Sequence, residues 1–426
     1  MLLIHLSDIH FRSTDIGTAQ DPNFALRNEI LRDCAAMCGQ IQKRPDAIIL
    51  SGDVAFAGQK EEYEFATTWL DQLAEACGVS ISEVFVCPGN HDVDRKLASR
   101  GINQALHSTI KTAPEVSRQA VIQGLLQEED TARFLYQPLD AYNLFAGQFF
   151  CDLSAPDRTR AVRDLSFLDG SILRLWGLNT AFVSSAADKQ GDLFVDGASL
   201  QITRDAGVEN VVILHHPTTW LRNGQELSDN LNAVARLQLS GHEHIGRIEQ
   251  HLRFVKLRAS AAHPDRHEPN WAPGYNLIEL EVEGVGEARS LSVNVHVRTW
   301  SAVTQRFQAQ TNEAGGPVWS QSIALEAWQP SHRPEAEAVQ TPLGDSADPP
   351  TPADMGSLRE IGVQFYTLSF SKKIEIVGRL ELLEDSDINV PDFERFRRVF
   401  ERAYERGQLD ALRAAVTEAK KASSQA

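Results

Sequence analysis

Residues 2–10 read LLIHLSDIH, an apolar run that ends in an aspartate and a histidine two positions apart. Two later segments repeat this arrangement: AIIL at 47–50 is followed by Gly52 and Asp53, and VFVC at 84–87 is followed by GNHD at 89–92. Short apolar runs that end in glycine or polar turns are typical of buried parallel strands. The sequence therefore predicts three parallel strands with chemically active side chains at their carboxyl ends.

The segments between these strands have the periodicity of amphipathic helices. Apolar residues recur on one helical face from Leu26 to Ile41 and again from Phe65 to Leu73, and Gly78 fits a helix end. Strands that alternate with helices predict an α/β sheet covered by helices. Further strand-like runs lie at 172–178, 211–214, 252–258, 275–283 and 291–300. We assign the last three of these runs to a second sheet.

Composition divides the chain into three parts. Residues 1–328 carry the strands and the motifs, with a helical insertion or cap at 96–150. Residues 329–357 hold six of the 18 prolines and five acidic residues but few large apolar side chains, which predicts a solvated linker. Helical periodicity then returns, so we expect residues 358–426 to form a small C-terminal all-α domain.

The overall charge argues against a protein that coats nucleic acid, and the cysteine content argues against a disulfide-linked protein. The 426 residues include 58 acidic and 41 basic side chains, a net charge of −17, and such a field repels a nucleic-acid backbone. The five cysteines are scattered without a C-x-x-C pair and are interpreted as reduced thiols. The N-terminal apolar run is too short for a signal peptide, and no segment reaches the ~20 apolar residues of a membrane helix. We therefore expect a cytoplasmic protein that does not bind membranes.

Five motifs in order along the chain supply side chains that bind metal ions. The candidate ligands are Asp8, His10, Asp53, Asn90, His215, His242 and His244. Alternate residues of an extended segment point to the same side, so each D-x-H or H-x-H pair can chelate one ion. Carboxylate, imidazole and amide groups suit Mn, Fe, Zn, Ni or Co better than Ca, and the absence of thiolates argues against a structural zinc site. Two ions that share Asp53 would use the whole set and leave positions open for water and substrate.

With its motifs D-x-H, G-D, G-N-H-D, H and G-H-x-H in this order, the sequence resembles the calcineurin-like metallophosphoesterase family over about residues 1–300. The resemblance implies a two-sheet sandwich flanked by helices, that is, the calcineurin-like phosphoesterase fold, and two divalent ions, with Mn or Fe favoured. It places Asp8, His10 and His244 on the first ion, Asp53 as the bridge, and Asn90, His215 and His242 on the second ion. It further implies in-line attack on phosphorus by a hydroxide that bridges the ions.

The resemblance also assigns catalytic roles and leaves alternatives open. His91 is expected to act as general acid or transition-state stabiliser, with Asp92 orienting it. His215 fits the H-x-P arrangement and is preferred as ligand over His216, which can instead face the substrate. Arg12 and Arg95 lie close to motifs and are candidate clamps for a phosphate group.

The GNHD variant and its continuation look more like the bacterial phosphodiesterase and nuclease-like branches of the family than like protein phosphatases. We therefore expect a phosphodiesterase that acts on a small phosphodiester such as a cyclic nucleotide or another nucleotide-like ester. The alternative is a metal-dependent nuclease that acts as an effector, with nucleic acid only as its substrate. A non-enzymatic scaffold is less favoured, because it would lack some of the family's metal ligands and this sequence has all of them. The C-terminal region resembles effector-associated and death-like adaptor domains, which implies a protein partner that binds residues 358–421.

Overall fold

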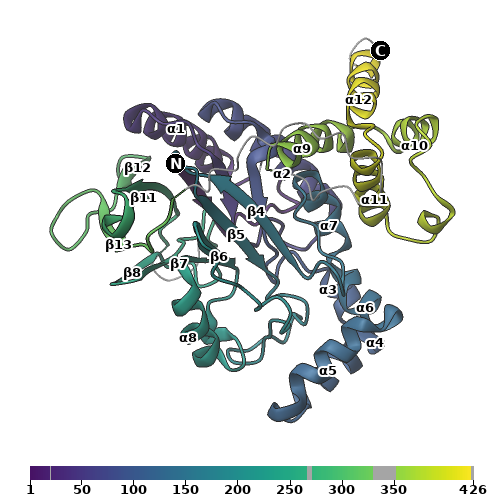
Figure 1. Cartoon of the computed structure of the whole chain (residues 1–426), viewed down its shortest axis with the longest axis horizontal. Coiled ribbons are helices and arrows are strands. Elements are labelled where there is room, and N and C mark those ends of the chain that lie inside the picture. The colour runs from purple at the N-terminus through teal and green to yellow at the C-terminus, as the bar shows by residue number, and fades with distance from the viewer. Residues whose placement is uncertain (20, 266–270, 330–351, 424–426) are drawn as a thin grey trace.

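The structure is a computed structural model that describes residues 1–19, 21–265, 271–329 and 352–423 (Figure 1). Most of the predicted linker at 329–357 lies outside these described residues.

The first sheet is built on the three strands predicted at the start of the chain. Strands β1 (Leu2–Leu6), β2 (Ala47–Leu50) and β3 (Val84–Val86) are parallel neighbours, and every one of their residues is buried. The sheet continues on the other side of β1 with β10 (Gly274–Glu283), β11 (Ser290–Ser301), β12 (Arg306–Ala309) and β13 (Trp319–Ala324).

This arrangement corrects the assignment of the segments 275–283 and 291–300 to a second sheet. Strand β10 pairs antiparallel with β1, and β11 pairs with β10. Because β1 is fully buried, its backbone groups need a partner on both edges, and β2 satisfies only one of them. The apolar pattern of the sequence reveals that a strand is buried but not which edge it fills.

The second sheet has four parallel strands at its centre and an antiparallel strand at each edge. Its order is β4 (Arg160–Ser166), β5 (Ile172–Leu178), β6 (Val208–Leu214), β7 (Ala235–Ser240), β9 (Phe254–Arg258) and β8 (Arg247–His251). The runs predicted at 172–178, 211–214 and 252–258 all lie in this sheet. The two sheets, with flanking helices, confirm the expected sandwich.

Helices α1 (Phe24–Ile41), α2 (Lys60–Cys77) and α8 (Gly224–Val234) flank the sheets (Figure 1). The predicted apolar faces are the buried ones, and Gly78 caps the C-terminal end of α2 in the left-handed conformation. All five cysteines are free and buried. Between β3 and β4 the chain is helical, with α3 (Arg95–Ala98), α4 (Gly101–Thr112), α5 (Glu115–Gln127), α6 (Glu129–Tyr136) and α7 (Asp140–Ala146). Short 3-10 helices lie at Ile81–Glu83, Gln137–Leu139, Gly147–Phe149, Thr218–Trp220, Gly286–Ala288 and Asp385–Asp387.

The C-terminal helices share a second hydrophobic cluster. They are α9 (Pro352–Tyr366), α10 (Phe370–Arg379), α11 (Asp392–Glu405) and α12 (Leu409–Ser423). Phe365, Phe396 and Phe400 are almost fully buried in this cluster, and Phe150 from the preceding part of the chain joins it, with its ring centroid 5.5 Å from that of Phe400. The C-terminal helices therefore pack directly against the rest of the molecule.

Ion pairs surround this apolar contact. Arg359 of α9 pairs with Glu83 at 3.0 Å, and Glu394 of α11 pairs with Arg158 at 2.5 Å. The buried carboxylate of Asp152 lies 2.8 Å from Arg158 and contributes a further link to α11. Because these side chains are mostly buried, salt screens their pairing less than it screens surface pairs.

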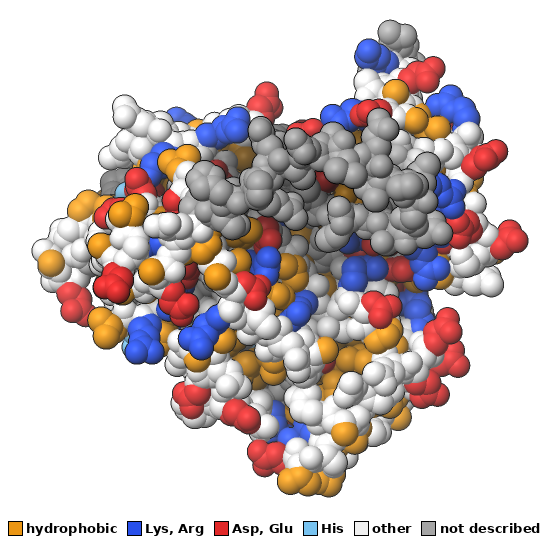
Figure 2. Space-filling model, in the orientation of Figure 1, with side chains coloured by type: hydrophobic (Ala, Val, Ile, Leu, Met, Phe, Trp, Pro, Cys, Tyr) orange, Lys and Arg blue, Asp and Glu red, His pale blue; other side chains and the backbone are white. Residues whose placement is uncertain are grey.

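Across the described residues, no helix combines the length and the apolar character needed to cross a lipid bilayer. Acidic and basic side chains are interspersed over the C-terminal helices on the face shown in Figure 2.

We expect Phe400→Ala to lower the free energy of unfolding by about 3–5 kcal/mol, because it removes a ring from a packed cluster. Urea titration followed by circular dichroism measures this loss. The matched control is Ile388→Ala, which truncates a side chain that is 68% exposed and should change stability by less than ~0.5 kcal/mol. Equal, small losses in both variants would contradict the packing described here.

Candidate metal centre

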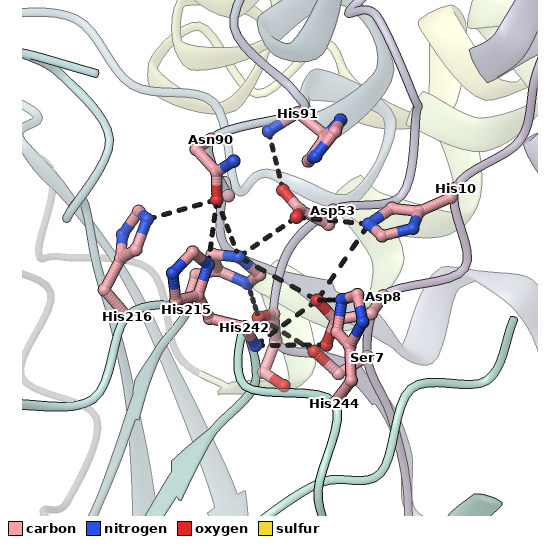
Figure 3. A network of polar contacts seen from close by, with 12 residues as sticks. Ser7, Asp8, His10, Asp53, Asn90, His91, His215, His216, His242 and His244 are labelled. Atoms are coloured by element: carbon pink, nitrogen blue, oxygen red, sulfur yellow. Dashed lines mark hydrogen bonds and ion pairs between the residues drawn. The ribbon is translucent and has the colours of Figure 1, made fainter. Parts of the chain in front are cut away.

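The loops that follow five parallel strands meet at one place between the two sheets (Figure 3). Strands β1, β2 and β3 of the first sheet lead into Asp8 and His10, into Asp53, and into Asn90 and His91. Strands β6 and β7 of the second sheet lead into the pairs His215–His216 and His242–His244. All seven predicted ligands are thus brought together, as expected for side chains beyond the carboxyl ends of parallel strands.

Asp53 occupies the middle of this cluster. Its Oδ2 lies 3.2 Å from Nε2 of His10 and 3.1 Å from Nε2 of His215. On the first side, Oδ1 of Asp8 lies 3.3 Å from Nε2 of His244. On the other side, Oδ1 of Asn90 lies 3.2 Å from His215 and 3.0 Å from His242.

The donor set fits bound cations. Four overlapping triplets have ligand atoms within 4.8 Å of one another: Asp8, His10 and His244; Asp8, Asp53 and His215; His10, Asp53 and His91; and His215, His216 and His242. Asp8 and Asp53 each belong to two triplets, and both carboxylates are buried. Oxygen and imidazole donors that converge in this way are those of borderline divalent metals.

The backbone of these loops adopts a conformation that side chains rarely tolerate. Among the described residues, ten non-glycine residues have positive φ, and five of them are the predicted ligands Asp8, His10, Asp53, His242 and His244. Such a conformation costs of order 1–3 kcal/mol per residue and persists only where the surroundings enforce it. Strain concentrated in this way is typical of a functional site.

Two glycines allow the loops to approach closely. A Cβ on Gly52, which has φ of +96°, would lie 2.6 Å from Nδ1 of His215. A Cβ on Gly89 would lie 2.6 Å from the main-chain nitrogen of Asp53. Any larger residue would displace a candidate ligand at either position, which explains why glycine precedes both motifs.

Burial and neighbouring charges shift the pKa values of the carboxyl and imidazole groups of the site. Burial opposes charge on Asp53, but the neighbouring His215 and His10 hold the pKa of its carboxyl well below the usual range. Burial lowers the pKa of His242 to about 3 and also lowers the pKa of His216. Asp53 is therefore ionised and these two imidazoles are neutral at physiological pH, the protonation states that metal binding requires. His215 differs: burial opposes its charge, but the carboxylates of Asp53 and Asp8 raise its pKa to about 9, so metal binding would have to release its proton.

His91 lies beside the cluster, and its ring is held by the main chain. Its Nδ1–H donates a hydrogen bond of 2.7 Å to the carbonyl oxygen of Phe56, and its main-chain N–H donates one of 2.7 Å to Oδ1 of Asp53. Nη2 of Arg95 lies 3.3 Å from the ring Nε2. Burial, opposed in part by the charge of Asp53, lowers the pKa of His91 to about 4.

The structure differs from the expectation that Asp92 orients His91. The Asp92 carboxylate accepts hydrogen bonds from the main-chain N–H groups of Gly89, Asp53 and Ala55 at 2.8–3.0 Å, and from the Tyr63 hydroxyl at 2.9 Å. These donors occupy the carboxylate, and the carbonyl group of Phe56 fixes the ring instead. Asp92 therefore holds together the two loops that carry Asp53 and Asn90.

The contacts of His215 and His216 distinguish these two candidate ligands only in part. Both rings reach Oδ1 of Asn90, at 3.2 and 3.1 Å. His215 also faces Asp53, whereas Nδ1 of His216 is engaged by the hydroxyl of Thr180 at 2.8 Å. The geometry favours His215 as ligand and keeps His216 beside it.

The candidate phosphate clamps lie on the side of His91. The guanidinium of Arg12 stacks 3.8 Å from the ring centroid of Phe56 and pairs with Asp265 at 3.6 Å.

Sequence reasoning missed two aromatic residues at the centre: Trp220, whose ring centroid lies 4.1 Å from that of His242, and Tyr63, which binds Asp92. Tyr63 lies on the predicted apolar face of α2, where nothing marks it as more than a core residue; Trp220 lies three residues after the H-x-P motif, a weak signal.

Comparison with known proteins agrees with the fold and the geometry. The profile described as Calcineurin-like phosphoesterase matches residues 1–246. The chain belongs to this family, whose members are metal-dependent phosphoester hydrolases. A second profile, described as GTPase-associated adaptor domain, matches residues 357–418.

A curated relative and several solved structures are similar over parts of the chain. The glycerophosphodiester phosphodiesterase GpdQ of Enterobacter lignolyticus is 35% identical over 92 residues, which are 22% of this chain and 30% of the relative. A Vps29 single mutant from Entamoeba histolytica superposes with a TM-score of 0.31 at 11% identity, over 76% of this chain and 100% of that one. GAP50 of Plasmodium gives a TM-score of 0.37 at 9% identity, over 77% and 90%. At these scores the structural likenesses carry no argument about function.

We expect Gly89→Ala to abolish stable metal binding, because the added Cβ displaces Asp53. Elemental analysis of the protein purified with added Mn measures the bound metal. The control is Gly101→Ala, where no atom lies within 4 Å of the added Cβ and the metal content should equal that of the wild type. A full complement of metal in Gly89→Ala would refute the close approach of the two loops as a requirement.

Proposed function

We propose that this protein is a phosphodiesterase that uses two divalent metal ions bound at the candidate centre. The observation that carries the proposal is the position of Asp53, whose single carboxylate oxygen contacts His10 on one side and His215 on the other. A carboxylate between two groups of ligands is suited to bridge two ions. The similarity to a glycerophosphodiester phosphodiesterase supports a diester over a monoester.

The residues that would hold the metals divide into two groups around Asp53. Asp8, His10 and His244 would hold the first ion. Asn90, His215 and His242 would hold the second, with Mn or Fe as the favoured metal. When bound, two such ions activate water at neutral pH and neutralise charge on the phosphoryl oxygens.

His91 is proposed to protonate the leaving group or to stabilise charge on it. Because Nδ1–H donates to Phe56, the other ring nitrogen, Nε2, is the one able to face a substrate. The pKa of about 4 leaves Nε2 unprotonated near neutral pH, so His91 would donate a proton to the leaving group only where the negative charge of a bound phosphoester raises that pKa. A nearby Arg95 can bind a non-bridging phosphoryl oxygen, and Arg12 stands on the same side over Phe56. Asp92 contributes indirectly, because it positions the Asp53 and Asn90 loops.

The substrate is proposed to be a small phosphodiester, such as a nucleotide-like ester. The net charge of −17 disfavours a long polyanion spread over the surface, and basic side chains on the face in Figure 2 are interrupted by acidic ones. His216, next to Asn90, is a further candidate contact. The match of residues 357–418 to an adaptor domain supports a protein partner for the C-terminal helices.

With added Mn, we expect the purified protein to hydrolyse bis-p-nitrophenyl phosphate faster than p-nitrophenyl phosphate. Asp53→Asn should abolish turnover, because it removes the charge that two ions would share. His91→Ala should lower kcat roughly 10²–10⁴-fold, the usual worth of a general acid. Release of p-nitrophenolate followed by absorbance measures each rate.

The control is His251→Ala, which removes an exposed histidine at the end of the edge strand β8 that is not a candidate ligand and should retain wild-type turnover. Preference for the monoester would overturn the assignment as a diesterase. Faster cleavage of single-stranded DNA, with affinity that falls steeply as salt rises, would favour the nuclease instead. Metal-loaded protein that is silent on every ester would refute the proposal.

A further inference from the structure

A cavity of about 670 Å³ lies between the C-terminal helices and the body that carries the metal centre. One wall is formed by α2 and α7, with residues such as Tyr63 and Leu144. The opposite wall is formed by the turn between α9 and α10 and by the start of α11, with residues such as Phe370 and Phe396. Its volume is in the range of sites that bind small organic molecules.

A buried lysine faces this cavity without a counter-ion. Lys373 is only 9% exposed and lines the cavity, and the contacts of its ammonium group are the rings of Phe365, Tyr366 and Phe396, at 5.3–6.0 Å from their centroids. Among the described residues, no carboxylate lies within ion-pair distance of this group. Burial lowers the pKa of Lys373 to about 8, although the negative charge of Asp392 opposes this shift.

The acidic residues of the wall are already paired. Glu64 is bound by Lys60 at 3.3 Å, and Asp392 by Arg395 at 2.5 Å. Lys373 is therefore the one charged side chain among the described lining residues that lacks a direct ion pair, and the charge of Asp392 acts on it only at longer range. A buried charge of this kind is costly unless a ligand satisfies it.

Helix geometry adds to the positive potential mainly through α10, because α2 and α11 have acidic residues in their first turns and α10 has none. Three helices have their first residue at this cavity: Lys60 of α2, Phe370 of α10 and Asp392 of α11. The N-terminal end of a helix carries a partial positive charge, and proteins use such ends, together with lysine, to bind phosphate. Aromatic and aliphatic side chains on both walls offer an apolar surface next to this positive region.

We infer that this cavity binds a small organic phosphate, with the anion against Lys373 and the helix ends and the apolar body against Leu144, Phe370 and Phe396. The occupant would contact both the C-terminal helices and α2, so it would stabilise their packing by mass action. It would also touch Tyr63, whose hydroxyl binds Asp92 and so supports the Asp53 loop. The site is separate from the candidate metal centre and does not depend on the proposed function.

Isothermal titration of the full chain with phenylphosphonate tests the inference, because this probe has an aromatic body and no ester bond to hydrolyse. Saturable binding by the wild type is expected, with Lys373→Met binding about tenfold or more weakly, as for loss of a charge-assisted contact. Lys372→Met is the matched control, since Lys372 is exposed and pairs with Glu375, and it should bind like the wild type. Phenylacetate tests whether a carboxylate suffices; weaker binding than the phosphonate is expected.

Equal binding by Lys373→Met and wild type would place the probe elsewhere, for example at the metal centre, and would overturn the inference. The inference would also be overturned if the wild type bound no phenylphosphonate or bound phenylacetate more tightly. Leu144→Trp fills the cavity from the opposite wall and should abolish binding while the charge of Lys373 stays in place. Loss of binding in both variants is then not explained by misfolding of one of them. Hydrolysis of bis-p-nitrophenyl phosphate by Lys373→Met should equal that of the wild type, so failure of the esterase proposal stays distinguishable from failure of this one.

Discussion

The structure depends on the burial of two carboxylates, Asp8 and Asp53, at the ends of adjacent strands. Two charges that close together in a buried site are unfavourable unless cations or N–H groups surround them. Here His10, His215 and His244 supply imidazole nitrogens, and the main-chain N–H of His91 binds Asp53. The loops must bend sharply to bring these groups in, which accounts for the positive φ values of five candidate ligands.

That requirement also fixes the two sheets relative to each other at the site. The His215 ring, from the second sheet, donates to the carbonyl oxygen of Ser51 at 2.9 Å, in the loop that follows β2 of the first sheet. Beyond β9, the main-chain N–H groups of Ala262 and His263 donate to the carbonyl oxygens of Ser7 and Asp8 at 2.9 and 3.1 Å. The loops of the two sheets that surround the site are thus held together by hydrogen bonds to main-chain carbonyl groups.

Much of this was predictable because the signals are local. The apolar runs before Asp8, Asp53 and Asn90 identify strands, and their order implies that the ligands meet. Strand pairing was predicted less well: the sequence does not show that β10 fills the open edge of β1, since pairing is a contact between segments hundreds of residues apart. The contacts of Asp92 differ from the predicted ones for a similar reason. Its position next to His91 suggests a contact between the two side chains, whereas its carboxylate turns away toward the N–H groups of neighbouring loops.

Helix α2 joins the two halves of this structure. At its N-terminal part, Tyr63 donates to Asp92, which in turn accepts from the main-chain N–H of Asp53. The same ring stacks on Phe145 of α7, with centroids 5.1 Å apart, and both residues line the cavity that the C-terminal helices close. The C-terminal helices contact α7 and face α2 across this cavity. Two hydrogen bonds, from Tyr63 to Asp92 and from the main-chain N–H of Asp53 to Asp92, thus connect one wall of the cavity to the Asp53 loop.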